Sequence, residues 1–435
     1  MKETSKLFPT GSDISENGHL LIGGCDTVSL AAEYGTPLYV LSEDDLRNRC
    51  REFKHDFGRR HYGARIVFAG KAWLNKTVLK LITEEGLGLD TVSGGELEIA
   101  AAVGFPMKDI YFHGNNKTDA ELELALDRGV GRIVIDNPGE VSRLAIIASR
   151  RNLIPTVLFR IRPGIDPHTH AKISTGNIDS KFGFSLDEAA HALPQAMASE
   201  NLNLVGFHYH IGSQIFEIQP FLDALSITME FMAEMKQLHG FVTQELDIGG
   251  GYAVQYLSGK EPPKMTEYAE AIFGHFHGEC RRLNLTPPEL AVEPGRALIA
   301  RAVVALYTVG VIKEISGVRR YICVDGGMAD NIRPALYGAE YEPYLANRMH
   351  DTSDTVCTVA GRFCESGDIL ATDIQLPEAI TGDILAMPVC GAYCLPMASN
   401  YNASLRPAVV MVKNGGSHLI RRRETIEDLL RCETS

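Results

Sequence analysis

The chain has 435 residues, of which 45% are hydrophobic and 22% are charged, and its formal net charge at pH 7 is −13. This length favours two domains, or one large barrel with an appendage. The negative charge disfavours a protein that binds nucleic acid or an anionic membrane, because both of those partners require a basic face.

The amino terminus and the cysteines bear on localisation. The first residues, MKETSKLFPTGS, lack the apolar core of a secretory signal. The longest apolar stretch, residues 297–312, contains Arg301 and is too short to span a bilayer. The nine cysteines include no C-x-x-C pair, and such a scattered odd number is typical of reduced thiols. We therefore expect a cytoplasmic protein.

Short apolar runs alternate with amphipathic helical stretches from about residue 60. The predicted strands are 65–70, 87–90, 109–112, 131–136, 156–161, 203–208, 244–248 and 289–293. The predicted helices are 76–85, 95–103, 119–128, 139–150, 219–238 and 265–283. Eight strands that alternate with helices predict a parallel (β/α)8 TIM barrel. An open doubly wound sheet is the alternative, and the count of eight favours the barrel.

The pattern changes after residue 297. Strand-like runs at 302–309, 319–324, 355–360 and 408–413 are separated by turn residues, which predicts an all-β domain. Residues 19–22 and 38–41 are also strand-like, so we expect the amino-terminal arm to pair with that domain. The predicted organisation is an arm over 1–45, a barrel over 46–297 and a β domain, sandwich-like or barrel-like, over 298–435.

Polar residues occur at the carboxyl end of every predicted barrel strand, where barrel enzymes place their chemistry. These residues are Lys71, Asp90, His113, Asp136, Arg160, Arg162, His208 and His210, then Gly249, Gly250 and Gly251, and finally Glu293 followed by Pro294, Gly295 and Arg296. A single such residue is usually structural. A polar residue or glycine run at all eight strand ends indicates a functional site.

The last two strand ends indicate a phosphate site, because loops after strands seven and eight often bind phosphate in this fold. Three glycines expose backbone N–H groups, and Arg296 adds a positive charge. Lys71 follows a buried strand and is placed to act as a nucleophilic amine. Pyridoxal phosphate, held as a Schiff base, has the phosphate and the aldehyde that suit both features. Glu293 would then pair with the pyridine nitrogen, His210 would stack on the ring, and Arg160 would bind the ring oxygen.

Several longer motifs connect this pattern to a known family. They are FAGKAW, LDTVSGGELEIAAAVGFP, FHGNNK, HTHAKISTGNIDSKFGF, GFHYHIGSQI, LDIGGGY, VEPGRAL, VDGGMADNIRPALY, CESGD and the GAY of residues 391–393. Together they cover roughly residues 18–425. With these motifs the chain resembles the fold-type III pyridoxal-phosphate decarboxylases, and within them the branch that acts on diaminopimelate.

The resemblance implies a role for individual residues. Lys71 would be the Schiff-base lysine and Cys364 the proton donor. The implied cofactor-binding residues are Lys71, Asp90, His113, Arg160, His210, Ser213, Gly249, Gly250, Gly251, Glu293, Pro294, Gly295, Arg296 and Tyr393. The implied substrate-binding residues are Arg296, Arg333, Tyr337, Glu365 and Tyr393. In this family the partner subunit supplies the cysteine and the neighbouring glutamate, which implies a homodimer.

The resemblance also implies a reaction, the decarboxylation of meso-2,6-diaminopimelate to L-lysine and CO2, the last step of lysine biosynthesis. Arg333 with Glu365 favours this substrate, because its distal end carries both a carboxylate and an ammonium. A carboxylate at Glu293 suits decarboxylation better than racemisation, for which related enzymes use an arginine. Trp73, His208 and Cys394 depart from the usual family pattern, and none of them removes a catalytic group.

Three alternatives stay open. The first is a decarboxylase of the same fold that acts on ornithine, arginine or carboxynorspermidine. The second is a metal-dependent barrel hydrolase, because His208 and His210 place two imidazoles on one strand face at ligand spacing. The third, a catalytically inactive binding homologue, is disfavoured because both Lys71 and Cys364 are present.

Overall fold

The computed structural model describes residues 6–59, 63–165 and 180–434. The chain divides into two compact units. A barrel unit comprises Cys50–Ala253 and Pro262–Gly295, and a β unit comprises Met1–Arg49, Val254–Glu261 and Arg296–Ser435. The motif over residues 168–184 lies mostly outside the described residues.

Eight parallel strands close the barrel, as the sequence predicts, and β12 pairs with β5 to complete it. The strands are β5 (Arg65–Ala69), β6 (Gly88–Thr91), β7 (Ile110–Phe112), β8 (Arg132–Ile135), β9 (Thr156–Arg160), β10 (Asn203–His208), β11 (Glu245–Asp247) and β12 (Glu289–Val292). Side chains from six of these strands form a buried cluster of Val67, Tyr111, Val134, Leu158, Val205 and Ala291. The barrel is thus a packed core, and chemistry is confined to its ends.

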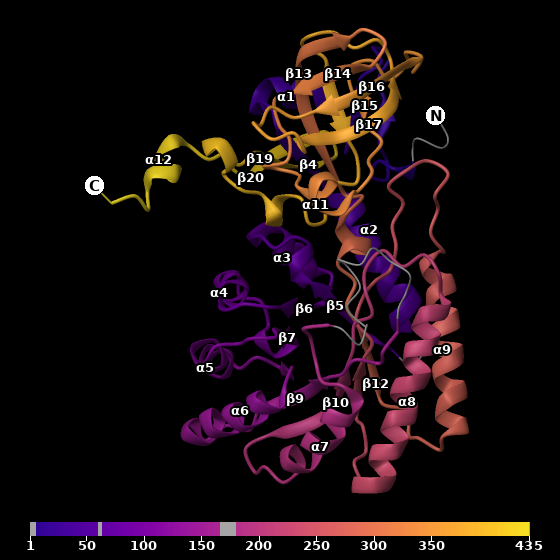
Figure 1. The fold of residues 1–435 in the computed structure, drawn as a ribbon, viewed down its shortest axis with the longest axis vertical. Coiled ribbons are helices and arrows are strands. Elements are labelled where there is room, and N and C mark those ends of the chain that lie inside the picture. Colours follow the sequence, from indigo (N-terminus) through magenta and orange to yellow (C-terminus); the bar gives the residue numbers. More distant parts are fainter. Residues whose placement is uncertain (1–5, 60–62, 166–179, 435) are drawn as a thin grey trace. The chain divides into compact units, whose positions relative to one another are not determined.

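Helices lie outside the barrel strands (Figure 1). They are α3 (Lys76–Glu84), α4 (Gly94–Ala102), α5 (Asp119–Arg128), α6 (Pro138–Arg151), α7 (Leu186–Met197), α8 (Gln219–His239) and α9 (Met265–Arg282). Thr118 caps α5 through a capping box with Glu121, which explains why the predicted start is confirmed. Helix α7 was not predicted, because Pro194 resembles a helix breaker, although a capping box between Ser185 and Glu188 fixes its start.

Three further helical segments of the described residues belong to the barrel unit, a π-helix followed by two 3₁₀ turns. They are η2 (Lys54–Arg59), η3 (Gly70–Ala72) and η4 (Met107–Asp109). Of these, η3 directly follows β5 and carries Lys71. The chain therefore turns at once after the buried strand, which keeps Lys71 at the carboxyl end of the barrel.

The β unit is built on a nine-stranded sheet. Its strands are β4 (Leu38–Ser42), β13 (Val303–Ile315), β14 (Arg319–Val324), β15 (Tyr344–Leu345), β16 (Thr355–Ala360), β17 (Ile369–Leu376), β18 (Ile384–Met387), β19 (Ala408–Lys413) and β20 (Gly416–Arg421). The fully buried β4 lies between β13 and β19, antiparallel to the first and parallel to the second. The predicted pairing of residues 38–41 with the carboxy-terminal strands is therefore confirmed.

Residues 19–22 pair differently from the prediction. They contribute β2 (Leu20–Ile22) to a separate three-stranded sheet with β1 (Asp13–Ile14) and β3 (Cys25–Asp26). The side chains of Leu20 and Ile22 still pack into the core of the β unit, against residues such as Val304 and Val410. Side-chain burial, rather than strand pairing, joins this segment to the larger sheet.

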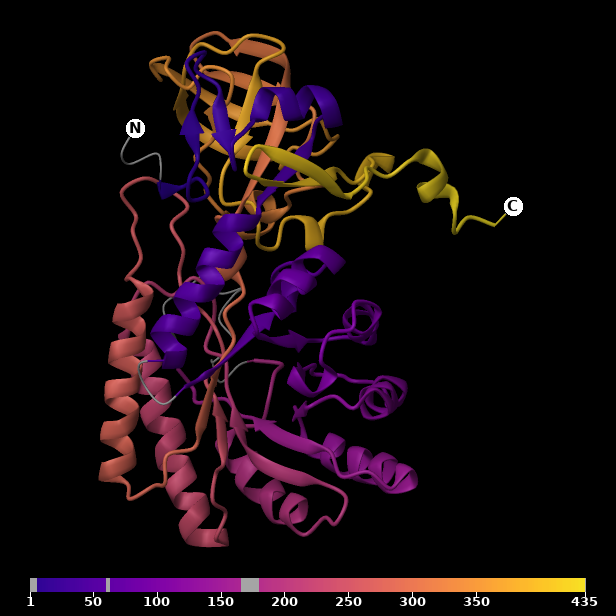
Figure 2. The same cartoon turned by 180° about the vertical axis from the view of Figure 1, so that it is seen from behind.

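The remaining helical segments are α1 (Thr27–Tyr34), α2 (Glu43–Phe53), α10 (Arg296–Ile299), α11 (Arg333–Tyr337), η5 (Leu395–Met397), η6 (Tyr401–Ala403) and α12 (Ile426–Leu430). Both views show that the segment with α12 runs away from the sheet of the β unit (Figures 1 and 2). Among the described residues, none of the helices combines the length and the apolar character that a membrane span requires.

Candidate active site

Lys71 lies beside a buried carboxyl group at the carboxyl end of the barrel. Its Nζ is 3.9 Å from Oδ2 of Asp90, which is on the neighbouring strand β6. The Lys71 side chain is 40% exposed, whereas Asp90 is almost completely buried. Burial raises the pKa of the Asp90 carboxyl above its ordinary value. The amine is thus accessible from solvent and is positioned by a neighbour on a different strand.

Glu293, which directly follows β12, lies between two imidazoles. Its Oε1 is 2.7 Å from Nε2 of His113, and its Oε2 is 3.2 Å from Nε2 of His208. All three side chains are buried. Burial alone would raise the pKa of the Glu293 carboxyl, but His113 and His208 hold that pKa well below its usual range. Glu293 is therefore a carboxylate in the barrel mouth.

Arg160 and His210 are half-buried members of the same group of titratable residues. The Arg160 guanidinium carbon is 4.5 Å from the centre of the Phe182 ring. Burial, followed by the charge of Lys71, lowers the pKa of His210 well below its usual range. Its Nδ1 accepts the Gly250 N–H at 3.2 Å. A neutral, fixed imidazole at this position suits stacking on a flat aromatic ring.

The glycine run forms a turn with no room for side chains. Gly249 has a φ of +67°, and a Cβ there would lie 2.5 Å from the Tyr209 carbonyl oxygen. A Cβ at Gly250 would overlap the carbonyl oxygen of Glu293. A Cβ at Gly251 would lie 2.8 Å from the Gly212 carbonyl oxygen. Only glycine fits these positions, so the chain passes close to its neighbours with no side chain in between.

Gly295 provides a second close approach, next to the lysine turn. A Cβ there would lie 2.9 Å from Cβ of Ala69. The Ala69 N–H donates to the carbonyl oxygen of Pro294 at 3.2 Å, which continues the β5–β12 pairing past the strand ends. Ser213, predicted to lie close to the phosphate, is half-buried in the loop after β10. A glycine cradle, an accessible lysine and a buried carboxylate together fit the phosphate, aldehyde and ring nitrogen of pyridoxal phosphate.

The β unit holds a separate cluster of arginines and tyrosines. Arg296 donates from Nη1 to the hydroxyl oxygen of Tyr256 at 2.7 Å, and Arg333 donates from Nη1 to the same oxygen at 3.0 Å. Arg333 Nη1 also contacts the hydroxyl of Tyr341. The Arg296 guanidinium lies 4.8 Å from the centre of the Tyr393 ring. The structure thus brings three of the predicted substrate-binding residues, Arg296, Arg333 and Tyr393, into one cluster.

Tyr337, Cys364 and Glu365 are the remaining residues predicted to act on the substrate. Tyr337 ends α11 and is half-buried. Cys364 and Glu365 are exposed in the turn between β16 and β17. The Cys364 N–H donates to Oδ1 of Asn402 at 3.0 Å. Within the described residues, no hydrogen bond joins the Cys364 or Glu365 side chain to Arg333.

Sequence reasoning missed three residues of these clusters. Asp247 ends β11 and accepts the Gly249 N–H at 2.8 Å. Its position at the end of a barrel strand could have identified it, but the prediction for this strand end used only the three glycines that follow. Tyr256 and Tyr341 lie outside helices and strands, where no periodic pattern marks them.

The three residues predicted to depart from the family pattern, Trp73, His208 and Cys394, are all buried. Trp73 is 4% exposed and belongs to the apolar core. The Cys394 thiol donates to Oδ1 of Asn331 at 3.4 Å and lies 3.5 Å from the Tyr341 hydroxyl. Cys394 therefore packs beside the arginine–tyrosine cluster through Tyr341.

The residues whose ligand atoms lie close enough to hold a metal ion are not the pair predicted from the sequence. The pair expected was His208 with His210. In the described part of the chain, ligand atoms of His113, His208 and Glu293 all lie within 4.8 Å of one another. His210 is instead engaged with the backbone of Gly250. The spacing of two histidines on one strand therefore did not predict a shared ligand geometry.

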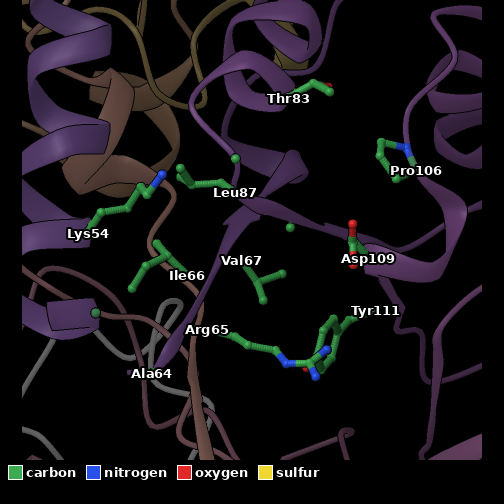
Figure 3. Close-up of a pocket in the computed structure, with 13 residues that line it drawn as sticks. Lys54, Ala64, Arg65, Ile66, Val67, Thr83, Leu87, Pro106, Asp109 and Tyr111 are labelled. Atoms are coloured by element: carbon green, nitrogen blue, oxygen red, sulfur yellow. The ribbon is translucent and has the colours of Figure 1, made fainter. Parts of the chain in front are cut away.

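A cavity of about 480 Å³ lies at the opposite end of the barrel (Figure 3). Its lining comes from the beginnings of strands β5 to β7, including Arg65, Ile66, Gly88 and Tyr111, together with Lys54. Because the strands are parallel, their beginnings lie away from Lys71 and Glu293. This cavity is therefore not part of the candidate site.

Comparison with a family model identifies the class of protein to which the barrel belongs. The family model described as "Pyridoxal-dependent decarboxylase, pyridoxal binding domain" matches residues 43–300. Lys71, Glu293 and the glycine cradle all lie within this segment. The barrel unit is thus that of a pyridoxal-dependent decarboxylase.

Known proteins that match nearly the whole chain identify the family within this class. The chain is 45% identical over 421 residues to the diaminopimelate decarboxylase of Bacillus subtilis (strain 168), with 96% of each chain covered. A crystal structure of diaminopimelate decarboxylase from M. jannaschii in complex with L-lysine is similar, with a TM-score of 0.92, 35% identity and 98% of each chain covered. A lysine/ornithine decarboxylase from Vibrio vulnificus shares the fold at a TM-score of 0.77 and 21% identity, covering 92% of this chain and all of that one. The chain belongs to the diaminopimelate decarboxylase family.

Proposed function

We propose that this protein converts meso-2,6-diaminopimelate to L-lysine and CO2 with pyridoxal phosphate, as the last step of lysine biosynthesis. The observation that carries the proposal is the barrel mouth, where Lys71 and the buried carboxylate of Glu293 follow the neighbouring strands β5 and β12. The relatives named above support the choice of substrate, and one of them is described in complex with L-lysine.

Each residue at the barrel mouth has a proposed task. Bound pyridoxal phosphate supplies an electron sink for the electron pair that CO2 leaves behind on Cα. Lys71 attaches the cofactor through its amine, and Glu293 keeps a proton on the ring nitrogen. The proposed phosphate-binding residues are Ser213, Gly249, Gly250, Gly251, Gly295 and Arg296, with Pro294 shaping the turn. The proposed ring-binding residues are Asp90, His113, Arg160, His210 and Tyr393.

Cys364 is the proposed acid. Once CO2 has left, Cα needs a proton, and a thiol can deliver one because its pKa lies near the working pH. Cys364 is exposed, so its Sγ is available to a substrate. By contrast, Cys390 and Cys394 are buried and are not positioned to supply solvent-derived protons.

Arg333 is the proposed anchor for the distal carboxylate. Its recorded hydrogen bonds, to Tyr256 and Tyr341, both use Nη1. Nε and Nη2 form the other edge of the planar guanidinium, and that edge has the geometry for a bidentate carboxylate. We propose that Glu365 binds the distal ammonium and that Tyr337 and Arg296 help to bind this end. Ornithine and lysine lack the distal carboxylate, so Arg333 selects against them.

We further propose a homodimer in which the partner subunit supplies Cys364 and Glu365. Two features of the β unit support it. Both residues are exposed, and among the described residues no hydrogen bond joins either side chain to Arg333. The segment with α12 runs away from its own sheet (Figure 2) and exposes Ile426 and Leu430 by 56% and 59%, as expected of a segment that packs on another chain.

A cytoplasmic location is also a proposal. None of the nine cysteines, all of which lie in the described residues, forms a disulfide, which fits a reducing compartment. Fractionation of source cells, with the protein detected by antibody, would test it. Recovery with secreted or periplasmic proteins would contradict it.

The decisive experiment measures CO2 and L-lysine released from meso-diaminopimelate, with and without added pyridoxal phosphate. Ornithine, arginine and carboxynorspermidine are the comparison substrates. Lys71→Ala should remove turnover and the cofactor adduct that borohydride reduces onto the protein. Lys80→Ala, at an exposed position of α3, is the matched control and should behave as wild type. Borohydride linkage to a different lysine, or faster turnover of ornithine than of diaminopimelate, would overturn the proposal.

A further inference from the structure

The two oxygens of Glu293 have unequal surroundings. Oε2 is hydrogen-bonded to Nε2 of His208 at 3.2 Å. Oε1 lies 2.7 Å from Nε2 of His113, but neither of these two atoms has an aligned hydrogen-bond partner. The rings of His113 and His208 meet edge to face, with their centres 4.6 Å apart. One carboxylate oxygen is therefore fixed by a donor, while the other is buried and still able to accept a hydrogen bond.

The hydrogen bond to Glu293 fixes the tautomer of His208. A carboxylate only accepts hydrogen bonds, so the proton must be on Nε2 of His208. Burial lowers the pKa of His208 to about 3, which keeps the ring neutral. Nδ1 then carries no proton, and it has no hydrogen-bond partner in the described structure. His208 thus acts as a single fixed donor to Oε2.

Asp247 is a second buried carboxyl group beside Glu293. It is as deeply buried as Glu293 and ends the neighbouring strand β11. Burial, followed by the charge of Glu293, raises the pKa of Asp247 well above its usual range. The two carboxyl groups interact with each other, so the charge on Glu293 itself contributes to the raised pKa of Asp247. Glu293 lies against two imidazoles, which favour its charged form.

We infer that His113 and His208 are positioning residues for the reaction: they hold Glu293 as a fixed carboxylate and leave Oε1 to accept the N–H of the cofactor's pyridine nitrogen. Neither histidine needs to touch the substrate. This inference rests on the proposed function, since it concerns the same cofactor. It adds that His208, a departure from the usual family pattern, acts on the ring nitrogen through Glu293.

The test pairs a change in the protein with a change in one cofactor atom. Dissociation constants are measured by absorbance and fluorescence for pyridoxal phosphate and for its 1-deaza analogue, which has C–H in place of the ring nitrogen. The wild type should prefer pyridoxal phosphate. His208→Leu should reduce that preference by about tenfold or more, as expected from weakening a charge-assisted hydrogen bond. His208→Gln keeps an N–H near the position of Nε2 and should preserve most of it.

Matched variants separate this role from a structural one. His191→Leu, at an exposed position of α7, should leave the preference unchanged. His208→Asn has a side chain too short to reach Oε2, so it should behave as His208→Leu, and it replaces that variant if leucine prevents folding. His113→Leu should reduce the preference in the same direction.

Each outcome has a clear meaning. Equal weakening of both cofactors in His208→Leu and His208→Asn would show a purely structural role and overturn the inference. A wild-type preference for pyridoxal phosphate over the 1-deaza analogue in either variant would also overturn the inference. Failure of the wild type to bind either cofactor would instead overturn the proposed function itself.

Discussion

Arg333 and Tyr256 are joined by a hydrogen bond of 3.0 Å from the guanidinium Nη1 to the phenol oxygen. The same oxygen accepts from Arg296, so one tyrosine orients two arginines. Arg333 is only 6% exposed, and its guanidinium lies 4.9 Å from the centre of the Tyr256 ring. A guanidinium fixed in this way is preorganised for a planar anion.

Replacing Arg333 should therefore change substrate recognition rather than cofactor binding. We expect Arg333→Lys to lower kcat/KM for meso-diaminopimelate by about 10–100-fold, because an ammonium cannot form the bidentate pair. Steady-state kinetics and cofactor titration measure the two effects separately. Arg319→Ala, in β14, is the control and should have wild-type kinetics. Wild-type kinetics in Arg333→Lys would remove the argument for the distal carboxylate.

Cys364→Ser should lower kcat by about 10²–10⁴-fold, the usual contribution of a positioned acid. Cys432 is the other exposed cysteine, so Cys432→Ser is a matched control and should keep full turnover. Equal rates for the two variants would exclude Cys364 as the proton donor. Cofactor absorbance should be the same in both.

Mixing two inactive variants tests whether active sites are shared between subunits. Lys71→Ala and Cys364→Ser are unfolded together and refolded as a mixture. If each site takes its lysine from one subunit and its cysteine from the other, half of the dimers have one intact site, and roughly a quarter of wild-type activity should return. Restored activity with dimeric protein supports the proposal. A dimer that stays inactive contradicts it.

Gly250→Ala should weaken cofactor binding and lower the free energy of unfolding, because its Cβ would overlap the carbonyl oxygen of Glu293. Overpacking of this kind costs about 1–3 kcal/mol. Gly274 in α9 has no atom within 4 Å of an added Cβ, so Gly274→Ala should be neutral or stabilising by about 0.5–1 kcal/mol. Urea unfolding and cofactor titration measure both variants. Equal stability of the two would contradict the steric argument.

Acid should destabilise the cofactor-free protein partly through His208. Its pKa is about 3 in the folded chain and 6.5 in the reference state. Between these values the unfolded chain binds a proton that the folded chain does not, so stability is complete above pH 6.5 and is lost as the pH falls towards 3. From pH 7.5 to pH 5, this group accounts for a loss of about 2 kcal/mol.

His208→Gln removes the titrating group and should reduce the loss between pH 7.5 and pH 5 by that amount. The free energy of unfolding in urea at the two pH values measures it. His191→Gln, at an exposed position, should keep the wild-type pH dependence. An unchanged loss in His208→Gln would show that His208 is not held neutral by burial.

Local pattern in the sequence was enough to predict much of the fold. The alternation of eight apolar runs with helices identified the barrel, because each strand and helix is set by its own periodicity and caps. Residues 119–128 show this best: Thr118 and Glu121 close a capping box that fixes the helix start. The position of Lys71 also followed from sequence, since barrel chemistry occurs at strand ends.

Prediction from local pattern failed for segments whose structure also depends on contacts with other parts of the chain. Pro194 resembles a breaker, yet α7 continues past it in the layer of helices around the barrel. Residues 19–22 are strand-like, but nothing in them specifies whether they pair with β13 or with β1 and β3.

The sequence by itself determined which residues we propose for the chemistry: a lysine after a buried strand, a glycine run and a glutamate. Only the tertiary structure decided how they act together. His113, His208 and Glu293 come from strands far apart in the chain, and closure of the barrel brings them within hydrogen-bonding distance. Distances across a barrel depend on strand register and stagger, which periodicity within a single strand does not encode.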